Sequence, residues 1–124
     1  MNPPLEKRGS IVNNVIELNE SNFEQEVLRA DGPVLVDYWA PWCAPCRVLG
    51  PVVERIAEER AGSLTVGKVN VDEEPVLADR AGVRGIPYLV LYAGAEPVGE
   101  VVGAHPKHTI ERALRLDAPT DRAA

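Results

Sequence analysis

The stretch that decides the fold is residues 34–51, VLVDYWAPWCAPCRVLGP. It opens with an apolar run of strand length, residues 34–40. After the second cysteine, apolar residues recur at helical spacing, at Val48, Leu49, Val52, Val53, Ile56 and Ala57. Both cysteines of the chain, Cys43 and Cys46, lie between these two patterns. The sequence therefore predicts a strand, a turn that carries the cysteine pair, and a helix.

The cysteines are expected at the start of this helix. A thiol in the first turn faces unpaired backbone N–H groups and the positive end of the helix dipole, which both favour the thiolate. Cys43 is the candidate for this position, and Cys46 would lie one turn deeper on the same face, within disulfide reach. The spacing thus favours a pair in which one sulfur attacks while the other waits.

A zinc half-site is the alternative interpretation of the Cys43-x-x-Cys46 spacing. His105 and His108 could supply the second half, but the two halves of such sites usually lie much closer in sequence. Pro45, between the cysteines, fits a redox turn. Two cysteines are too few for a secreted disulfide scaffold. We therefore interpret the pair as redox-active and predict no metal site.

Residues Trp42-Cys43-Ala44-Pro45-Cys46, with Asp37 upstream and Ile86-Pro87 well downstream, resemble the thioredoxin family. The likeness runs from about residue 15 to residue 116. The departures from the family pattern are Ala44 for the usual Gly, Tyr88 where Thr is frequent, and His105 and His108 just beyond Gly103. None of them removes a catalytic group, so they bear on the range of clients and not on the class of reaction.

The resemblance implies catalytic roles for four residues. Cys43 would attack, and Cys46 would resolve the mixed disulfide and form a disulfide with Cys43 in the oxidised protein. Asp37 would accept the proton of Cys46, often through water, with Lys68 near it. On residue type alone, Asp37 would simply accept backbone N–H bonds, and Lys68 would be a surface lysine.

The resemblance also implies a flat apolar surface around the attacking sulfur, which we call the docking rim. In thioredoxins the proline that matches Pro87 is cis and faces the cysteines, and the backbone beside it, here Ile86, docks an extended client peptide. Taken singly, each rim residue could be ordinary core or turn. The substrate-binding residues expected on the docking rim are Trp42, Ala44, Pro45, Ile86, Pro87, Gly103 and Ala104.

The rest of the chain fits one α/β domain, with 45% hydrophobic and 26% charged residues in a length of 124. Strands are predicted at residues 15–18, 34–40, 64–71, 88–92 and 97–102. Four helices are predicted: one that begins near Ser21, one that follows Cys46, one at residues 76–81 and one that begins near Pro106. Ser21 and Glu24 have the spacing of a capping box. The fold implied is the thioredoxin fold, a mixed central sheet of about five strands flanked by about four helices, over residues 15–117. Residues 1–14 are expected to form a flexible extension, and residues 118–124 a frayed tail.

Charge and targeting signals limit the partners. A net charge of −6 argues against nucleic acid and anionic membrane as partners. The first residues lack the apolar core of a signal peptide, and no apolar run could span a bilayer. We therefore expect a cytoplasmic monomer.

The predicted function is reduction of disulfides in client proteins, which maintains cell redox homeostasis. The chain shows no cofactor motif, so no bound cofactor is expected. The resemblance implies that NADPH supplies the electrons through thioredoxin reductase, although some organisms use a ferredoxin-linked enzyme. One alternative is a thiol–disulfide oxidase or isomerase, which would favour His between the cysteines and a secretory signal. The other is a non-catalytic module that binds a partner protein through the docking rim.

Overall fold

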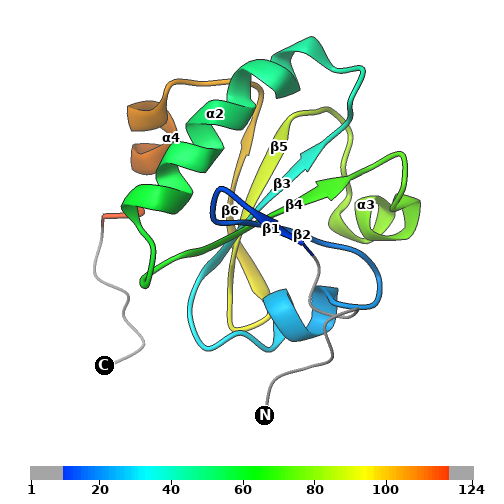
Figure 1. The fold of residues 1–124 in the computed structure, drawn as a ribbon, viewed down its shortest axis with the longest axis horizontal. Coiled ribbons are helices and arrows are strands. Elements are labelled where there is room, and N and C mark those ends of the chain that lie inside the picture. The colour runs from blue at the N-terminus through cyan, green and yellow to red at the C-terminus, as the bar shows by residue number, and fades with distance from the viewer. Residues whose placement is uncertain (1–9, 118–124) are drawn as a thin grey trace.

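The computed structural model describes residues 10–117. Its strands are β1 (Ile11–Val12), β2 (Val15–Glu17), β3 (Val34–Trp39), β4 (Thr65–Asn70), β5 (Tyr88–Ala93) and β6 (Glu96–Val102). Its helices are the π-helix η1 (Glu24–Leu28), α2 (Ala44–Glu59), α3 (Pro75–Ala81) and α4 (Lys107–Ala113). Figure 1 shows α2 crossing the sheet and α3 on the opposite side of the molecule. The predicted α/β fold with a mixed sheet is confirmed.

The sheet has the strand order β1-β2-β4-β3-β5-β6. Strands β2, β4 and β3 run parallel, whereas β5 is antiparallel to β3 and β6 is antiparallel to β5. The last two strands form the predicted hairpin. As a result, β3 lies inside the sheet, hydrogen-bonded on both edges to strands that are distant in sequence.

The sheet has six strands and not about five, because the chain enters it before Val15. Ile11 and Val12 pair antiparallel with Ile16 and Val15. The connecting residues, Asn13 and Asn14, both have positive φ (53° and 67°), which Asn tolerates better than most residues and which suits a two-residue hairpin turn. Residues 1–9 of the predicted extension and residues 118–124 of the predicted tail lie outside the described residues.

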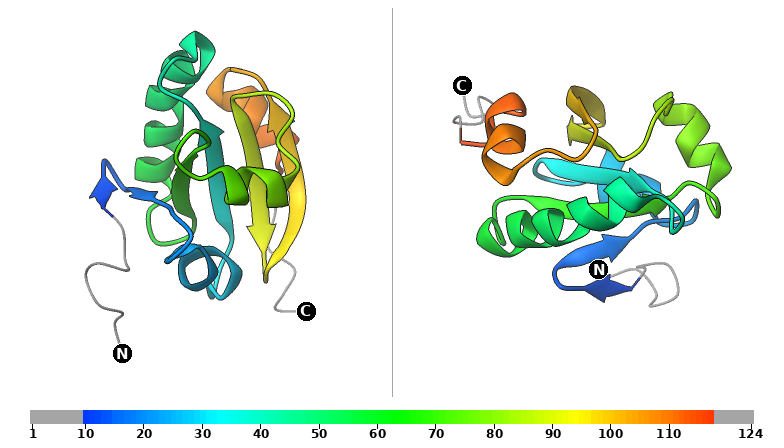
Figure 2. Two further views of the ribbon diagram at one scale, coloured as in Figure 1. Left: turned by 90° about the vertical axis from the view of Figure 1, so that its right-hand side faces the viewer. Right: turned by 90° about the horizontal axis from the view of Figure 1, so that it is seen from above.

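The two faces of β3 belong to two separate cores. Val34, Val36 and Tyr38 pack in a cluster with side chains of η1 and α3, including Val27 and Leu77. Leu35 packs on the other face, in a cluster with residues of α2 and α4. In the left panel of Figure 2, η1 and α3 lie in front of the strands and α4 lies behind them. Because helices cover both faces, β3 needs the nearly continuous apolar sequence that its residues provide.

The helix expected from Ser21 begins differently from the prediction. The side chain of Asn19, not that of Ser21, accepts hydrogen bonds from the backbone N–H groups of Ser21 and Asn22, at 2.9 and 3.0 Å. The Ser21 hydroxyl itself donates to Asn19 Oδ1 at 2.6 Å. The predicted capping box is therefore wrong: Asn19 takes the N–H groups of the turn that leads into the short η1, and Phe23, the N-cap of η1, makes no side-chain capping bond.

Candidate active site

Cys43 and Cys46 lie where β3 passes into α2, as predicted. Cys43 is the N-cap of α2, with extended backbone (φ −90°, ψ 107°), and its Sγ accepts a hydrogen bond from the Cys46 N–H at 3.2 Å. The two residues form a disulfide, with their Cα atoms 5.2 Å apart. Both are buried, together with Ala40. The sulfur of Cys43 thus has a first-turn amide of a sixteen-residue helix pointing at it.

Asp37 lies behind the cysteines, on the same face of β3 as the helix α2. Its side chain is 5% exposed, and its Oδ1 has no hydrogen-bond partner among residues 10–117. Burial raises the pKa of Asp37, the charge of Lys68 lowers it, and the result is a pKa of about 7. The carboxyl group is therefore able to change its protonation state near neutral pH.

Lys68 is the register partner of Asp37 on the neighbouring parallel strand β4. Its Nζ lies 5.1 Å from the centre of the Trp39 ring, which places the ammonium over an aromatic face. Trp39 is half-buried and packs against the cluster of Ala40, Cys43 and Cys46. The structure thus brings Asp37 and Lys68 to one side of the cysteine pair.

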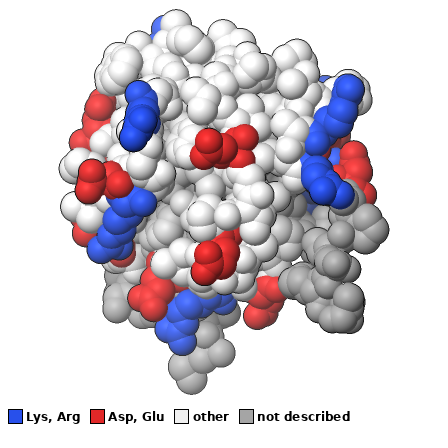
Figure 3. All heavy atoms as spheres, turned by 180° about the vertical axis from the view of Figure 1, so that it is seen from behind, with Lys and Arg blue, Asp and Glu red and all other residues white. Residues whose placement is uncertain are grey.

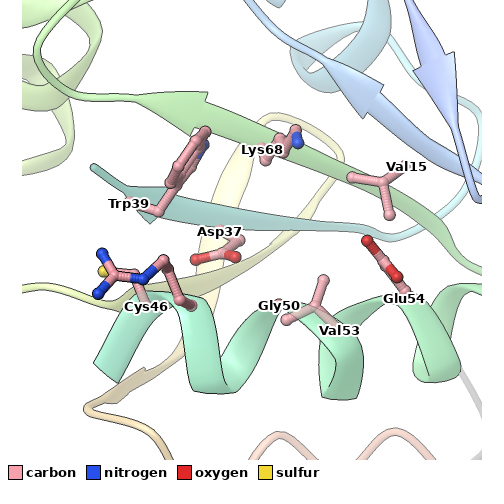
Figure 4. Close-up of a pocket in the computed structure, with 9 residues that line it drawn as sticks. Val15, Asp37, Trp39, Cys46, Gly50, Val53, Glu54 and Lys68 are labelled. Carbon is pink, nitrogen blue, oxygen red and sulfur yellow. The ribbon is translucent and has the colours of Figure 1, made fainter. Parts of the chain in front are cut away.

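A pocket of about 120 Å³ connects these groups (Figure 4). Its lining residues are Val15, Asp37, Trp39, Cys46, Arg47, Gly50, Val53, Glu54 and Lys68. The pocket is large enough for several water molecules, and Asp37 Oδ1 and Trp39 Nε1 are buried polar atoms that lack a partner within the described chain. It therefore offers a water-mediated route between the Cys46 sulfur and the Asp37 carboxylate.

The expected rim residues come from three parts of the chain, and several of them meet. Ile86 is half-buried and packs against the cluster formed by Ala40, Cys43 and Cys46. The Ile86–Pro87 peptide bond is cis. The Gly103 N–H donates to the Pro87 carbonyl oxygen at 2.8 Å, and this joins two of the segments. The remaining rim residues lie exposed at the surface: Trp42, Ala44, Pro45 and Ala104.

Sequence reasoning missed two residues of this region, Asp72 and Glu54. Trp42 is 67% exposed, and its indole Nε1 donates to Asp72 Oδ2 at 2.9 Å, which fixes the position of the ring. Asp72 follows β4, and the carboxyl ends of parallel strands meet at one edge of a sheet, so the pairing of β3 with β4 could have indicated it. Glu54 lines the pocket with Asp37 from the second turn beyond the cysteines, but no local pattern marked it.

The two histidines of the zinc alternative have other neighbours. His105 Nε2 lies 2.8 Å from the Val102 carbonyl oxygen, and His108 Nδ1 lies 3.7 Å from Glu111 Oε1. Within residues 10–117, no group of three or more His, Cys, Asp or Glu side chains is placed to hold a metal ion. Over the same residues, no helix combines the length and apolar character that a membrane span requires.

Comparison with known proteins assigns the family. The Thioredoxin family model matches residues 14–116. Thioredoxin 1 of Nostoc sp. is 50% identical over 98 residues, which are 79% of this chain and 92% of the relative. Thioredoxin of Porphyra purpurea is 48% identical over 100 residues (81% and 94%), and thioredoxin of Alicyclobacillus acidocaldarius is 45% identical over 97 residues (78% and 91%). A match of this extent, on a chain whose two cysteines pair at the start of a helix, shows that the protein belongs to the thioredoxin family of thiol–disulfide oxidoreductases.

Proposed function

We propose that Cys43 and Cys46 divide the reduction of a client disulfide between them. The Cys43 thiolate attacks one client sulfur, which forms a Cys43–client disulfide and releases the other client sulfur as a thiolate that takes up a proton. Cys46 then loses its proton, and its thiolate attacks Cys43 Sγ. The Cys43–Cys46 disulfide forms, the second client thiolate leaves, and two electrons have passed from the pair to the client. The observation that carries this division is the position of Cys43 as N-cap of α2, with an amide directed at its sulfur.

Asp37 is the proposed base for the second step. Its carboxylate shares a pocket with Cys46, and a pKa of about 7 allows it to accept a proton and to release it again at physiological pH. Lys68 favours the ionised form of Asp37 through its charge. In this proposal Asp37 acts on Cys46 through water, and Lys68 tunes Asp37 without contacting the reacting sulfurs.

Clients would bind at the docking rim as an extended segment. Ile86 and Trp42 supply apolar surface beside the cysteines, and the backbone at Ile86 supplies strand-like hydrogen-bonding groups. The other proposed rim contacts are Ala44, Pro45, Pro87, Gly103 and Ala104. This mode of binding selects for an exposed, flexible client loop around the disulfide, because the backbone groups of a strand inside a client sheet are already paired and are not free to bond with the rim.

The oxidised protein has to be reduced again by an external donor. We propose NADPH through thioredoxin reductase as the source, in keeping with the family, and a cytoplasmic monomer as the working form. A reducing compartment suits a reductase whose pair must return to the dithiol after each turnover.

The proposal is tested with insulin as a disulfide client and dithiothreitol as the electron donor. The wild type should accelerate insulin reduction, and Cys43→Ser should not. Cys46→Ser should accumulate a mixed disulfide with the client, which Cys43→Ser should not form. No turnover by the wild type would favour the binding-module alternative, and equal trapping by both variants would contradict the division of labour. Equilibration of the wild type with glutathione buffers separates a reductase from an oxidase, since an oxidase would have the less negative potential.

A further inference from the structure

An open hollow of about 590 Å³ adjoins the docking rim on the side of β6. Its Gly85 directly precedes Ile86, and its Val102 directly precedes Gly103. A Cβ atom added to Gly85 would lie 3.9 Å from Val102 Cγ1, so the two flanks of the hollow are in near contact where they meet the rim. We call it the Arg84 hollow. Its lining residues are Gly82, Arg84, Gly85, Tyr88, Glu100 and Val102.

Two charged side chains line the Arg84 hollow, but they do not pair. The Glu100 carboxylate accepts a hydrogen bond from the Tyr88 hydroxyl across the β5–β6 ladder. The ion pairs within residues 10–117 all join groups near α4 and the C-terminal half of α2, and none includes Arg84. Arg84 is exposed. The hollow thus presents an unpaired guanidinium, while its one carboxylate is engaged by a tyrosine.

The overall charge of the chain is the background against which Arg84 would act. The chain as a whole has a net charge of −6. Seen from behind, the surface is mostly uncharged, with acidic side chains near its centre and basic side chains towards its margins (Figure 3). A client carboxylate that reaches Arg84 would gain a planar, two-pronged partner.

The distance from the cysteines sets which client residue could reach the hollow. Arg84 lies two residues before Ile86, which packs against the cluster that contains both cysteines. An extended client advances about 3.3 Å per residue along the rim. A side chain about two to four residues from the client cysteine would therefore reach Arg84.

We propose that the Arg84 hollow is a second client-binding subsite that selects for aspartate or glutamate about two to four residues from the client cysteine. This proposal rests on the proposed function, because the client must first dock at the rim. Arg84 is the specificity residue. Tyr88 is a positioning residue, because its hydroxyl holds Glu100 and leaves Arg84 available to the client.

The test uses three disulfide-containing peptides that differ only in one residue, Glu, Gln or Lys, scanned over these positions. The rate constant for reduction by the dithiol protein is measured for each peptide at low and high salt. The wild type should reduce the Glu peptide about threefold to fivefold faster than the Lys peptide, the upper part of the range that an exposed ion pair provides, and salt should weaken the preference. Arg84→Gln should bring this ratio to about one, and Arg84→Glu should invert it. Arg84→Lys, which keeps the charge but not the two-pronged geometry, should retain only part of it.

Arg29→Glu is the matched control. It makes the same change in net charge at an exposed arginine that follows η1, at the opposite end of the sheet from the start of α2 (Figure 1). It should leave the Glu-to-Lys ratio at the wild-type value. If Arg84→Glu and Arg29→Glu change the ratio equally, only net charge matters and the subsite is overturned. An unchanged ratio in Arg84→Glu overturns it as well.

Tyr88→Phe tests the positioning role without removing the cation. Loss of the hydroxyl frees Glu100 to compete for Arg84, so the Glu-to-Lys ratio should fall while both charged residues remain. Adding Glu100→Gln to Tyr88→Phe should restore the ratio, because the competitor is gone. A ratio that Tyr88→Phe leaves unchanged removes Tyr88 from this role. Reduction of the Gln peptide by the wild type tests the proposed function separately from the subsite.

Discussion

Asp37 and Lys68 are register partners on the parallel strands β3 and β4, and Lys68 Nζ lies 5.1 Å from the centre of the Trp39 ring. The ammonium is therefore held over an indole that borders the Asp37 pocket. Burial raises the pKa of Asp37 more than this charge lowers it, which gives a pKa of about 7. This balance makes Asp37 the residue whose protonation most affects both stability and reactivity near neutral pH.

Replacing Asp37 should stabilise the oxidised protein at high pH. Because the carboxyl pKa is higher in the folded state (about 7) than its ordinary value of 3.8, the contribution of Asp37 to stability is most favourable below about pH 4 and is lost as the pH rises towards 7. Asp37→Asn lacks this dependence. The variant should match the wild type near pH 4 and exceed it by about 4 kcal/mol above pH 7, in urea unfolding across that range. Parallel stability curves would show that Asp37 ionises normally.

The same substitution should slow resolution of the mixed disulfide more than it slows the initial attack. In the wild type, the resolution rate should rise with pH through about 7, because Asp37 must be ionised to accept the proton of Cys46. Asp37→Asn should lose this inflection. Single-turnover kinetics separates the two steps, and a variant with slow attack and normal resolution would remove Asp37 from the proposed role.

Removing the Lys68 charge should raise the pKa of Asp37 further. Lys68→Gln deletes the one favourable charge on the carboxylate, so the inflections in both stability and resolution rate should move to higher pH. Lys68→Arg, which keeps the positive charge, should leave them nearer the wild-type pH. Titration of the Asp37 carboxyl by NMR would measure the shift directly. An inflection that stays in place in Lys68→Gln would show that the ammonium is too far from Asp37 to act.

Ala44→Gly should change client preference more than the reduction potential. Ala44 is the exposed first residue of α2 and is absent from the positive-φ residues, so it needs no glycine conformation. We expect the potential to move by less than about 30 mV, measured against glutathione buffers. Rates with several clients should change unequally, because Ala44 is one of the proposed contacts of the docking rim. A larger shift of potential, with all clients changed in proportion, would assign Ala44 to the redox couple.

Much of the fold could be predicted because β3 and α2 have unambiguous patterns. The apolar run that contains Asp37 fits a strand covered on both sides, and the residues after Cys46 repeat at helical spacing. Strand β1 could not be predicted, because two exposed residues provide no alternation and are ordered only by pairing with β2. The prediction of Ser21 as the capping residue failed for a different reason, because Asn19, two residues earlier, competes for the same backbone N–H groups.

The candidate site, like the fold, could be predicted only in part. The cysteine pair has a local signature, so its position could be read from the sequence. Asp72 and Arg84 have none, because their roles depend on how loops meet at the edges of the sheet. The sequence marked Tyr88 only as a departure from the family pattern, and its contact with Glu100 requires the pairing of β5 with β6.

The interior position of β3 has a consequence for hydrogen exchange. Residues 35–38 are hydrogen-bonded within ladders to both β4 and β5, so this segment cannot open without breaking two ladders and both cores. Their amides should exchange only by opening that costs nearly the whole free energy of unfolding, whereas amides of β1 should exchange much faster. Local opening of β3 is therefore too costly to carry protons to the Asp37 carboxyl. The carboxyl lines the same pocket as Cys46, so we expect the residues that line this pocket to control the rate of proton exchange with the cysteine pair.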